Sequence, residues 1–147
     1  MPEQSSHSEL SFADCVNLQV AMLDSGKPLD AFDRFFAAHG TMYANDEIFA
    51  DSAEEGRRKQ EPFILAAQSI SGLIIDLKIV ESQEICIFRN RSSFTTSNTT
   101  VHQIDGLCWQ KWHNRKIIEE RYYDGEQMLS LVENGILSDP ASLSNHL

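Results

Sequence analysis

The feature that most constrains this chain is the alternation of apolar and polar residues between Ile70 and Asp124. Successive side chains of a strand point to opposite faces, so such alternation is typical of half-buried strands. Four segments show it: residues 73–80, 84–96, 99–113 and 117–124. Short polar turns join them, as at residues 113–116 (HNRK). These turns predict antiparallel hairpins and therefore a continuous, mostly antiparallel sheet.

Three segments with helical spacing of apolar residues precede the strands. The first begins with a capping-box pattern at Ser11 and Asp14, and the second begins at Pro28, which suits a first helical turn. The third is expected to begin near Pro62, after a charged, exposed loop at residues 52–60. Helices followed by a strand meander predict an α+β fold, in which a curved sheet wraps around helices and a pocket lies between them.

The length of 147 residues fits a single domain. The helix and strand patterns cover residues 11–133, which form the expected domain. Residues 1–10 are polar and are expected to be a flexible N-terminus. Residues 134–147 are expected to be a flexible C-terminal tail.

Composition restricts the partners. The chain has 12 Lys and Arg residues against 22 Asp and Glu residues, a net charge of −10. Binding to nucleic acid or to anionic membranes depends on clustered positive charge, so we expect neither as a partner. No apolar run reaches transmembrane length, and residues 1–10 lack the apolar region of a secretory signal. The three cysteines are widely spaced without a C-x-x-C motif, which indicates reduced thiols and a cytoplasmic location.

Known catalytic motifs are absent from the sequence. The five histidines are scattered, with no pair at metal-ligand spacing. No phosphate-binding loop, dinucleotide fingerprint or nucleophile elbow occurs. We therefore expect no metal and no cofactor. What remains is general acid–base chemistry by a carboxylate or a histidine in a semi-apolar cavity.

Several short motifs occur in an order and spacing that resemble a known family. They are Leu23–Gly26, Met42–Asp46 (MYAND), Gly56 with Phe63, and the hairpin Trp112–Asp124. Over about residues 12–124 the chain resembles SnoaL-like (polyketide cyclase-like) proteins of the nuclear-transport-factor-two-like superfamily, which includes ketosteroid isomerase and scytalone dehydratase. The resemblance implies a cone-shaped α+β barrel that often forms a homodimer through the outer face of its sheet.

The resemblance also implies three catalytic candidates. Asp51 follows Tyr43 at the distance that separates the corresponding tyrosine of ketosteroid isomerase from its proton-shuttling aspartate. His102 is the only histidine that the resemblance places on the pocket face, where a neutral imidazole could act as acid or base. Asp124 ends the last strand and points inward. Structural roles remain open for all three: a turn or cap for Asp51 and Asp124, and a bond to a neighbouring strand for His102.

Eight further side chains are implied to line the pocket: Gln19, Tyr43, Phe63, Cys108, Gln110, Trp112, Glu120 and Tyr122. Two of them stand at or near the positions of strong hydrogen-bond donors in ketosteroid isomerase, Gln19 for its tyrosine and Cys108 for its protonated aspartate. A thiol is a weak donor, and losing a donor to a developing oxyanion lowers the rate by about 10²–10³. Steroid isomerisation by the same machinery is therefore not expected.

Two functions fit these residues. The first is an enzyme that binds a small hydrophobic molecule and moves a proton next to its carbonyl, as an isomerase, cyclase or dehydratase does. The second is a non-catalytic ligand-binding or dimerisation module on the same scaffold, since one fold hosts many functions. A homodimer is expected in addition because Ile85, Ile87 and Trp109 would be unfavourable in water.

Overall fold

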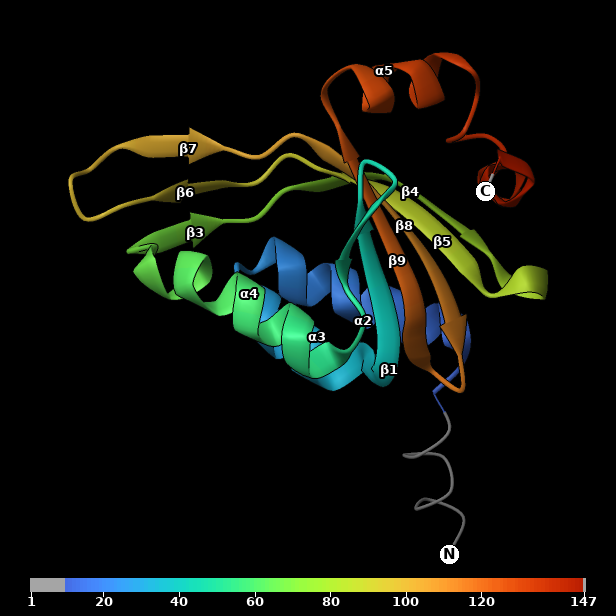
Figure 1. The fold of residues 1–147 in the computed structure, drawn as a ribbon, viewed down its shortest axis with the longest axis horizontal. Helices are drawn as coiled ribbons and strands as arrows, with labels where there is room; N and C mark the ends of the chain where they lie inside the picture. Colours follow the sequence, from blue (N-terminus) through green and yellow to red (C-terminus); the bar gives the residue numbers. More distant parts are fainter. Residues whose placement is uncertain (1–9, 147) are drawn as a thin grey trace, which may run out of the picture.

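One curved sheet forms the centre of the computed structural model, which describes residues 10–146 (Figure 1). Its six strands are β1 (Phe36–Ala44), β2 (Glu47–Ala50), β4 (Ile74–Val80), β5 (Ile85–Asn90), β8 (Gly106–His113) and β9 (Lys116–Asp124). They follow the order β2-β1-β9-β8-β5-β4, and all neighbours are antiparallel except β1 and β9. The predicted α+β fold with a curved, mostly antiparallel sheet is confirmed.

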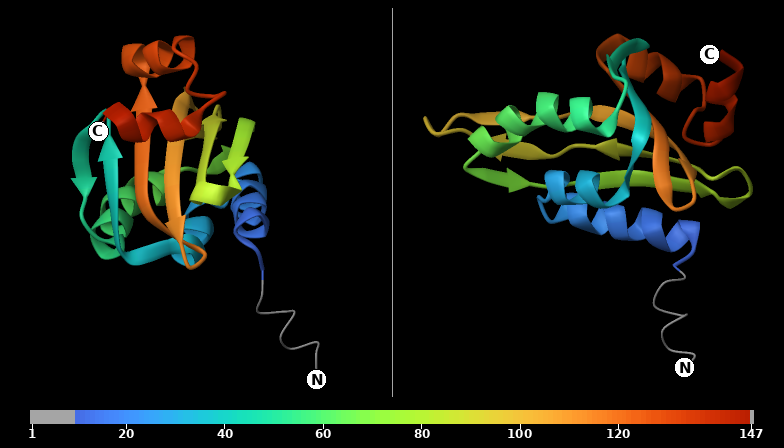
Figure 2. Two further views of the ribbon diagram at one scale, coloured as in Figure 1. Left: turned by 90° about the vertical axis from the view of Figure 1, so that its right-hand side faces the viewer. Right: turned by 60° about the horizontal axis from the view of Figure 1, so that its bottom comes forward.

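Three helices lie together on one side of the sheet, which we call its inner face (Figures 1 and 2). They are α2 (Phe12–Asp24), α3 (Pro28–Phe35) and α4 (Ala53–Ala66). The predicted capping box starts α2, since the Ser11 Oγ accepts a hydrogen bond of 3.0 Å from the Asp14 amide. The expected flexible N-terminus lies, except for Leu10, outside the described residues.

The start of α4 differs from the prediction. Residues 52–60 are not a loop: Ser52 is the N-cap, and the helix runs on through Pro62, which was expected in the first turn. The charges in this segment form pairs one turn apart, such as Arg57 with Glu61 at 2.8 Å. Such pairs support a solvent-exposed helix face. A charged segment was therefore mistaken for a loop.

A second, three-stranded sheet extends away from the first (Figure 1). It contains β3 (Ser69–Ser71), β6 (Ser93–Thr95) and β7 (Val101–Gln103), in the order β3-β6-β7. The segments 84–96 and 99–113, each predicted as one strand, are therefore each divided in two. One break has a local cause: the Asn90 Oδ1 accepts a hydrogen bond of 3.0 Å from the Ser92 amide, and this short turn interrupts the strand ladder.

The C-terminal part of the chain covers the outer face of the main sheet (Figure 2). After α5 (Gly125–Glu133) the chain continues to a 3₁₀ helix, η2 (Pro140–His146). Ile136 and Leu143 are 3% and 2% exposed, and the Trp109 Nε1 donates a hydrogen bond of 2.9 Å to the Pro140 carbonyl oxygen. The prediction of a flexible tail is therefore wrong for these described residues.

This C-terminal segment also removes one reason for expecting a homodimer. The three side chains in that argument, Ile85, Ile87 and Trp109, are each at most 2% exposed. They pack in one cluster with Met128, Ile136 and Leu143 of the same chain. Their apolar surface is thus withdrawn from water without a second subunit.

None of the helices within residues 10–146 combines the length and the apolarity needed to cross a bilayer.

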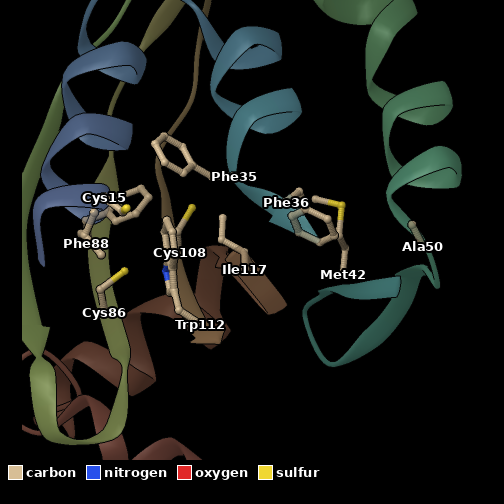
Figure 3. Close-up of a cluster of buried hydrophobic side chains, with 11 residues drawn as sticks. Cys15, Phe35, Phe36, Met42, Ala50, Cys86, Phe88, Cys108, Trp112 and Ile117 are labelled. Carbon is tan, nitrogen blue, oxygen red and sulfur yellow. The ribbon is translucent and has the colours of Figure 1, made fainter. Parts of the chain in front are cut away.

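Buried side chains between the inner face and the helices form the main core (Figure 3). Trp112 lies within this core, with its ring centroid 5.6 Å from that of Phe35 and 5.8 Å from that of Phe12. Cys15, Cys86 and Cys108 are buried free thiols, as the sequence indicated.

Candidate functional site

A cavity of about 470 Å³ has walls formed by the inner face, by α2, α3 and α4, and by β3 and β6 of the second sheet. Most wall residues are apolar, and six are phenylalanines: Phe32, Phe36, Phe49, Phe63, Phe88 and Phe94. Polar residues also contribute to the wall: Gln19, Tyr43, Lys59, Gln60, Asn90, Glu120 and Tyr122. A mostly apolar cavity of this size with a few polar groups is typical of a site for a small molecule.

Glu120 is the carboxylate in this wall. It pairs across the sheet with Gln110, whose Nε2 donates a hydrogen bond of 3.0 Å to the Glu120 Oε2. The other oxygen, Oε1, accepts no hydrogen bond from the described residues and is not fully buried. Burial raises the pKa of Glu120 above its ordinary value, and the bond from Gln110 opposes this in part.

Gln110 itself is 1% exposed and holds the centre of a buried hydrogen-bond network. Its Oε1 accepts hydrogen bonds from the Gln19 Nε2 at 2.9 Å, the Trp112 Nε1 at 3.1 Å and the Cys86 Sγ at 3.3 Å. Its Nε2 donates to the Gln19 Oε1 at 2.8 Å as well as to Glu120. The network therefore joins α2, β5, β8 and β9 directly behind the Glu120 carboxylate.

Tyr122 follows Glu120 by two positions on β9 and shares its inner face. Its ring lies against Gly106: a Cβ atom there would come within 2.2 Å of the phenol. Burial raises the pKa of the Tyr122 phenol, with the nearby Cys108 adding to the effect, so the hydroxyl stays protonated. Since that hydroxyl has no partner among the described residues, it can donate a hydrogen bond to a bound molecule.

Asn90 contributes a second free donor to the wall. Its Oδ1 is occupied by hydrogen bonds from Ser92, whereas its Nδ2 has no acceptor within residues 10–146. Sequence reasoning missed Asn90, because the chain breaks at this point between β5 and β6 and the alternation of faces ends there. No local signal marks it as a cavity residue.

Six of the eight predicted pocket residues belong to the wall: Gln19, Tyr43, Phe63, Cys108, Glu120 and Tyr122. Gln110 and Trp112 do not; they are buried behind it in the network and the core. Tyr43 has a second contact, since the Arg121 guanidinium lies 3.9 Å from the centroid of its ring. Phe63 is 75% exposed and therefore lies at the open edge of the cavity.

The structure does not bring the three catalytic candidates to the cavity, which corrects the expected positions. Asp51 is exposed, and its amide donates a hydrogen bond of 2.9 Å to the Glu55 side chain at the start of α4. Asp124 is exposed and accepts a bond of 2.8 Å from the Asn45 Nδ2. Both lie where a strand ends, and neither belongs to the cavity wall.

His102 is the third candidate, and it lies in β7 of the second sheet. Its ring is exposed and stacks on the Phe94 ring with the centroids 4.9 Å apart. The predicted single strand from 99 to 113 would have continued the inner face to this residue, but the strand divides before it. Among residues 10–146, no cluster of three or more His, Cys, Asp or Glu residues could hold a metal ion.

The fold is that of the cone-shaped, nuclear-transport-factor-two-like (NTF2-like) proteins, as the resemblance implied. A solved structure from Mesorhizobium loti, described as a proposed SnoaL-like polyketide cyclase, matches with a TM-score of 0.64 and 17% identity, over 78% of this chain and 100% of that one. An NTF2-like protein of unknown function from Exiguobacterium matches with a TM-score of 0.60 and 15% identity, over 76% and 98%.

A protein with a ketosteroid isomerase-like fold from Catenulispora acidiphila, in complex with trimethylamine, matches with a TM-score of 0.59 and 12% identity, over 78% of this chain and 87% of that one. At these identities the similarity shows the fold alone. The sequence matches no family model, and it matches no curated protein either. Any statement about activity therefore rests on the site itself.

Proposed function

We propose that the cavity binds a small, mostly apolar carbonyl compound and that Glu120 transfers a proton next to the carbonyl. The observation that carries this proposal is the Glu120 carboxylate in the wall of an apolar cavity, with Oε2 held by Gln110 and with Oε1 not fully buried and unpaired among the described residues. Burial raises the pKa of this carboxyl. A carboxyl with a raised pKa is suited to take up and return a proton close to neutral pH.

The oxygen of the substrate would accept hydrogen bonds from Tyr122 and Asn90. The Cα atoms of Glu120 and Tyr122 are roughly 6–7 Å apart, as alternate residues of a strand are, which leaves room for a reacting group between their side chains. Donors placed where negative charge develops lower the barrier to enolate formation. In this proposal Glu120 takes the acid–base role for which the sequence had suggested Asp51, His102 and Asp124.

In this proposal the Glu120 carboxylate removes a proton from the carbon next to the carbonyl, and the electron pair of the broken C–H bond forms an enolate. Return of the proton to another carbon gives an isomerase. Attack of the enolate on a second carbonyl, with the proton on Glu120 passed to the new alkoxide, gives a cyclase. Expulsion of a β-hydroxyl group, which takes that proton and leaves as water, gives a dehydratase. The proposed cyclase among the structural neighbours supports the capacity of this scaffold for such chemistry.

Binding without catalysis is the second candidate, and one observation favours it. The Gln19 Nε2 and the Trp112 Nε1 both donate to Gln110, so neither of these contacts serves a bound oxygen atom. Fewer strong donors are then left to stabilise an enolate. In this case the cavity would hold a hydrophobic ligand, with Glu120 accepting a hydrogen bond from it.

The cytoplasmic location of the protein and its assembly as a homodimer also stay predictions.

Deuterium exchange at the carbon next to a carbonyl tests proton transfer without knowledge of the natural substrate. Small cyclic and aromatic ketones would be incubated with the protein in D₂O and followed by ¹H NMR, with binding measured by calorimetry. The wild type is expected to accelerate exchange, and Glu120→Gln to lose this acceleration by a factor of about 10² or more. Glu119→Gln is the matched control, because Glu119 pairs with Arg121 and is not a wall residue.

The outcomes separate the two candidates. Binding of ketones without exchange in the wild type would favour the ligand-binding function. Equal exchange by the wild type and Glu120→Gln would remove Glu120 from the mechanism. No binding of any ketone would contradict the proposed substrate class.

A further inference from the structure

Gln110 has all of its hydrogen-bonding groups in use, although it does not belong to the cavity wall. Its Oε1 accepts bonds from Gln19, Trp112 and Cys86, and its Nε2 donates to Gln19 and Glu120. A buried amide with every group paired is held in one orientation, because any rotation leaves partners unsatisfied. The orientation of this amide therefore determines whether the Glu120 Oε2 meets a hydrogen-bond donor or an acceptor.

Trp112 decides which way round the amide lies. An indole N–H can only donate, so the group 3.1 Å from the Trp112 Nε1 must be the Gln110 oxygen. The Gln110 Nε2 then points to the Glu120 Oε2, 3.0 Å away. A flip of the amide would place two donors against each other at Trp112. It would also give Glu120 an acceptor in place of a donor.

We infer that Gln110 is the positioning residue of this site and confines the exchangeable proton of Glu120 to Oε1, the oxygen that is unpaired among the described residues. A proton on Oε2 would turn it into a hydroxyl oxygen, a weaker acceptor than a carbonyl oxygen, and so would weaken the bond from the Gln110 N–H. A proton on Oε1 leaves every bond of the network intact. The inference rests on the proposed role of Glu120 as the acid–base group, and it adds that only one of the two oxygens exchanges a proton.

The surrounding titratable groups do not offer another partner. The neighbouring strands contribute Cys86 and Cys108, and β9 contributes Tyr122; burial raises the pKa of all three, so they stay uncharged. Lys59 from α4 is in the wall, but its ammonium lies 3.3 Å from the Glu55 carboxylate. Of the groups that act on the Glu120 pKa, only the bond from Gln110 lowers it.

Two substitutions test this orientation on the full chain without any ligand. Gln110→Met removes the donor. Trp112→Phe keeps most of the ring volume but removes the N–H that prevents the flip, so Gln110 becomes free to accept a proton from Oε2. Gln19→Met is the matched control, because it removes a partner of Gln110 but leaves both Trp112 and Glu120 in contact with it. If Gln110→Met fails to fold, Trp112→Phe still tests the inference.

Two spectroscopic readouts report on Glu120 itself. The ¹³C shift of its carboxyl group, assigned with Glu120→Gln, gives the titration midpoint. The infrared C=O stretch of the protonated acid reports whether its carbonyl oxygen accepts a hydrogen bond. In Gln110→Met we expect an upward shift of the midpoint and a C=O stretch at higher frequency. In Trp112→Phe we expect an upward shift of the midpoint, and in Gln19→Met no change in either quantity.

Equal midpoints in the wild type and in whichever of these two variants folds would overturn the inference. So would a shift in Gln19→Met as large as in Gln110→Met, because it would reflect general loosening of the network. These results do not depend on ketone exchange. If the wild type failed to exchange ketone protons while the spectra behaved as expected, the proposed catalysis would be wrong and the positioning by Gln110 would stand.

Discussion

Gln19 and Gln110 are 91 positions apart in the sequence, yet their side-chain amides form two reciprocal hydrogen bonds of 2.8 and 2.9 Å. Both residues are buried, at 4% and 1% exposure. The pair connects α2 to β8 and stands directly behind the Glu120 carboxylate. The stability of the inner core therefore depends on this contact, whereas the bond from Gln110 to Glu120 is a separate one.

Replacing Gln19 by Met is expected to lower the free energy of unfolding by about 1–3 kcal/mol, because a Gln110 N–H loses its acceptor in a buried position. Urea denaturation followed by tryptophan fluorescence measures the change. Gln127→Met in the exposed first turn of α5 is the control and should change stability by less than about 0.5 kcal/mol. Equal effects of the two substitutions would contradict the role given to the buried pair.

The raised pKa of Glu120 predicts a specific dependence of stability on pH. In the folded state this carboxyl holds its proton more tightly than at its ordinary pKa of 4.5. Its contribution to stability is therefore fully present below pH 4.5 and is lost as the pH rises through the folded pKa. Glu120→Gln cannot ionise, so its stability relative to the wild type should increase over this pH range.

Chemical denaturation at a series of pH values from acid to neutral measures this difference. Glu119→Gln, on the same strand, provides the control and should not show the same trend. A difference between Glu120→Gln and the wild type that does not vary with pH would show that the Glu120 pKa is not raised by folding.

The C-terminal segment is expected to stabilise the domain by covering the outer face. Leu143 is 2% exposed in η2, whereas the next residue, Ser144, is exposed. Leu143→Asp should lower the free energy of unfolding by about 2–4 kcal/mol, because it places a charge in an apolar contact. It should also promote self-association through the uncovered face. Ser144→Asp is the control, and sedimentation velocity with thermal unfolding measures both effects.

Pro62 lies inside α4, where its ring removes a helical hydrogen bond. The side chain is exposed, so no core contact depends on it. Pro62→Ala is therefore expected to raise the free energy of unfolding by about 1–3 kcal/mol. Arg58→Ala, at an exposed position of the same helix, controls for helix propensity alone. A loss of stability in Pro62→Ala would indicate that the proline has a structural role in this helix.

The residue pattern of a segment was sufficient to predict those elements that are stabilised by interactions within the same segment. The capping box of α2, the start of α3 at Pro28 and the strand that became β9 all follow from short-range hydrogen bonding and alternation. The residue pattern gave the wrong start for α4, because i,i+4 charge pairs stabilise a helix that continues through a proline. It also failed where the alternation continued but the sheet divided, after Asn90 and before Gly106.

The sequence by itself determined the fold class and six residues of the cavity wall, among them Cys108, Glu120 and Tyr122, which the resemblance placed on the pocket face. It did not determine which carboxylate meets the cavity. That choice depends on where strands end, on the turns that hold Asp51 and Asp124, and on the bond from Gln110 to Glu120. Desolvation and hydrogen bonding depend on neighbours from distant parts of the chain, so only the tertiary structure distinguishes Glu120 from the other acidic residues.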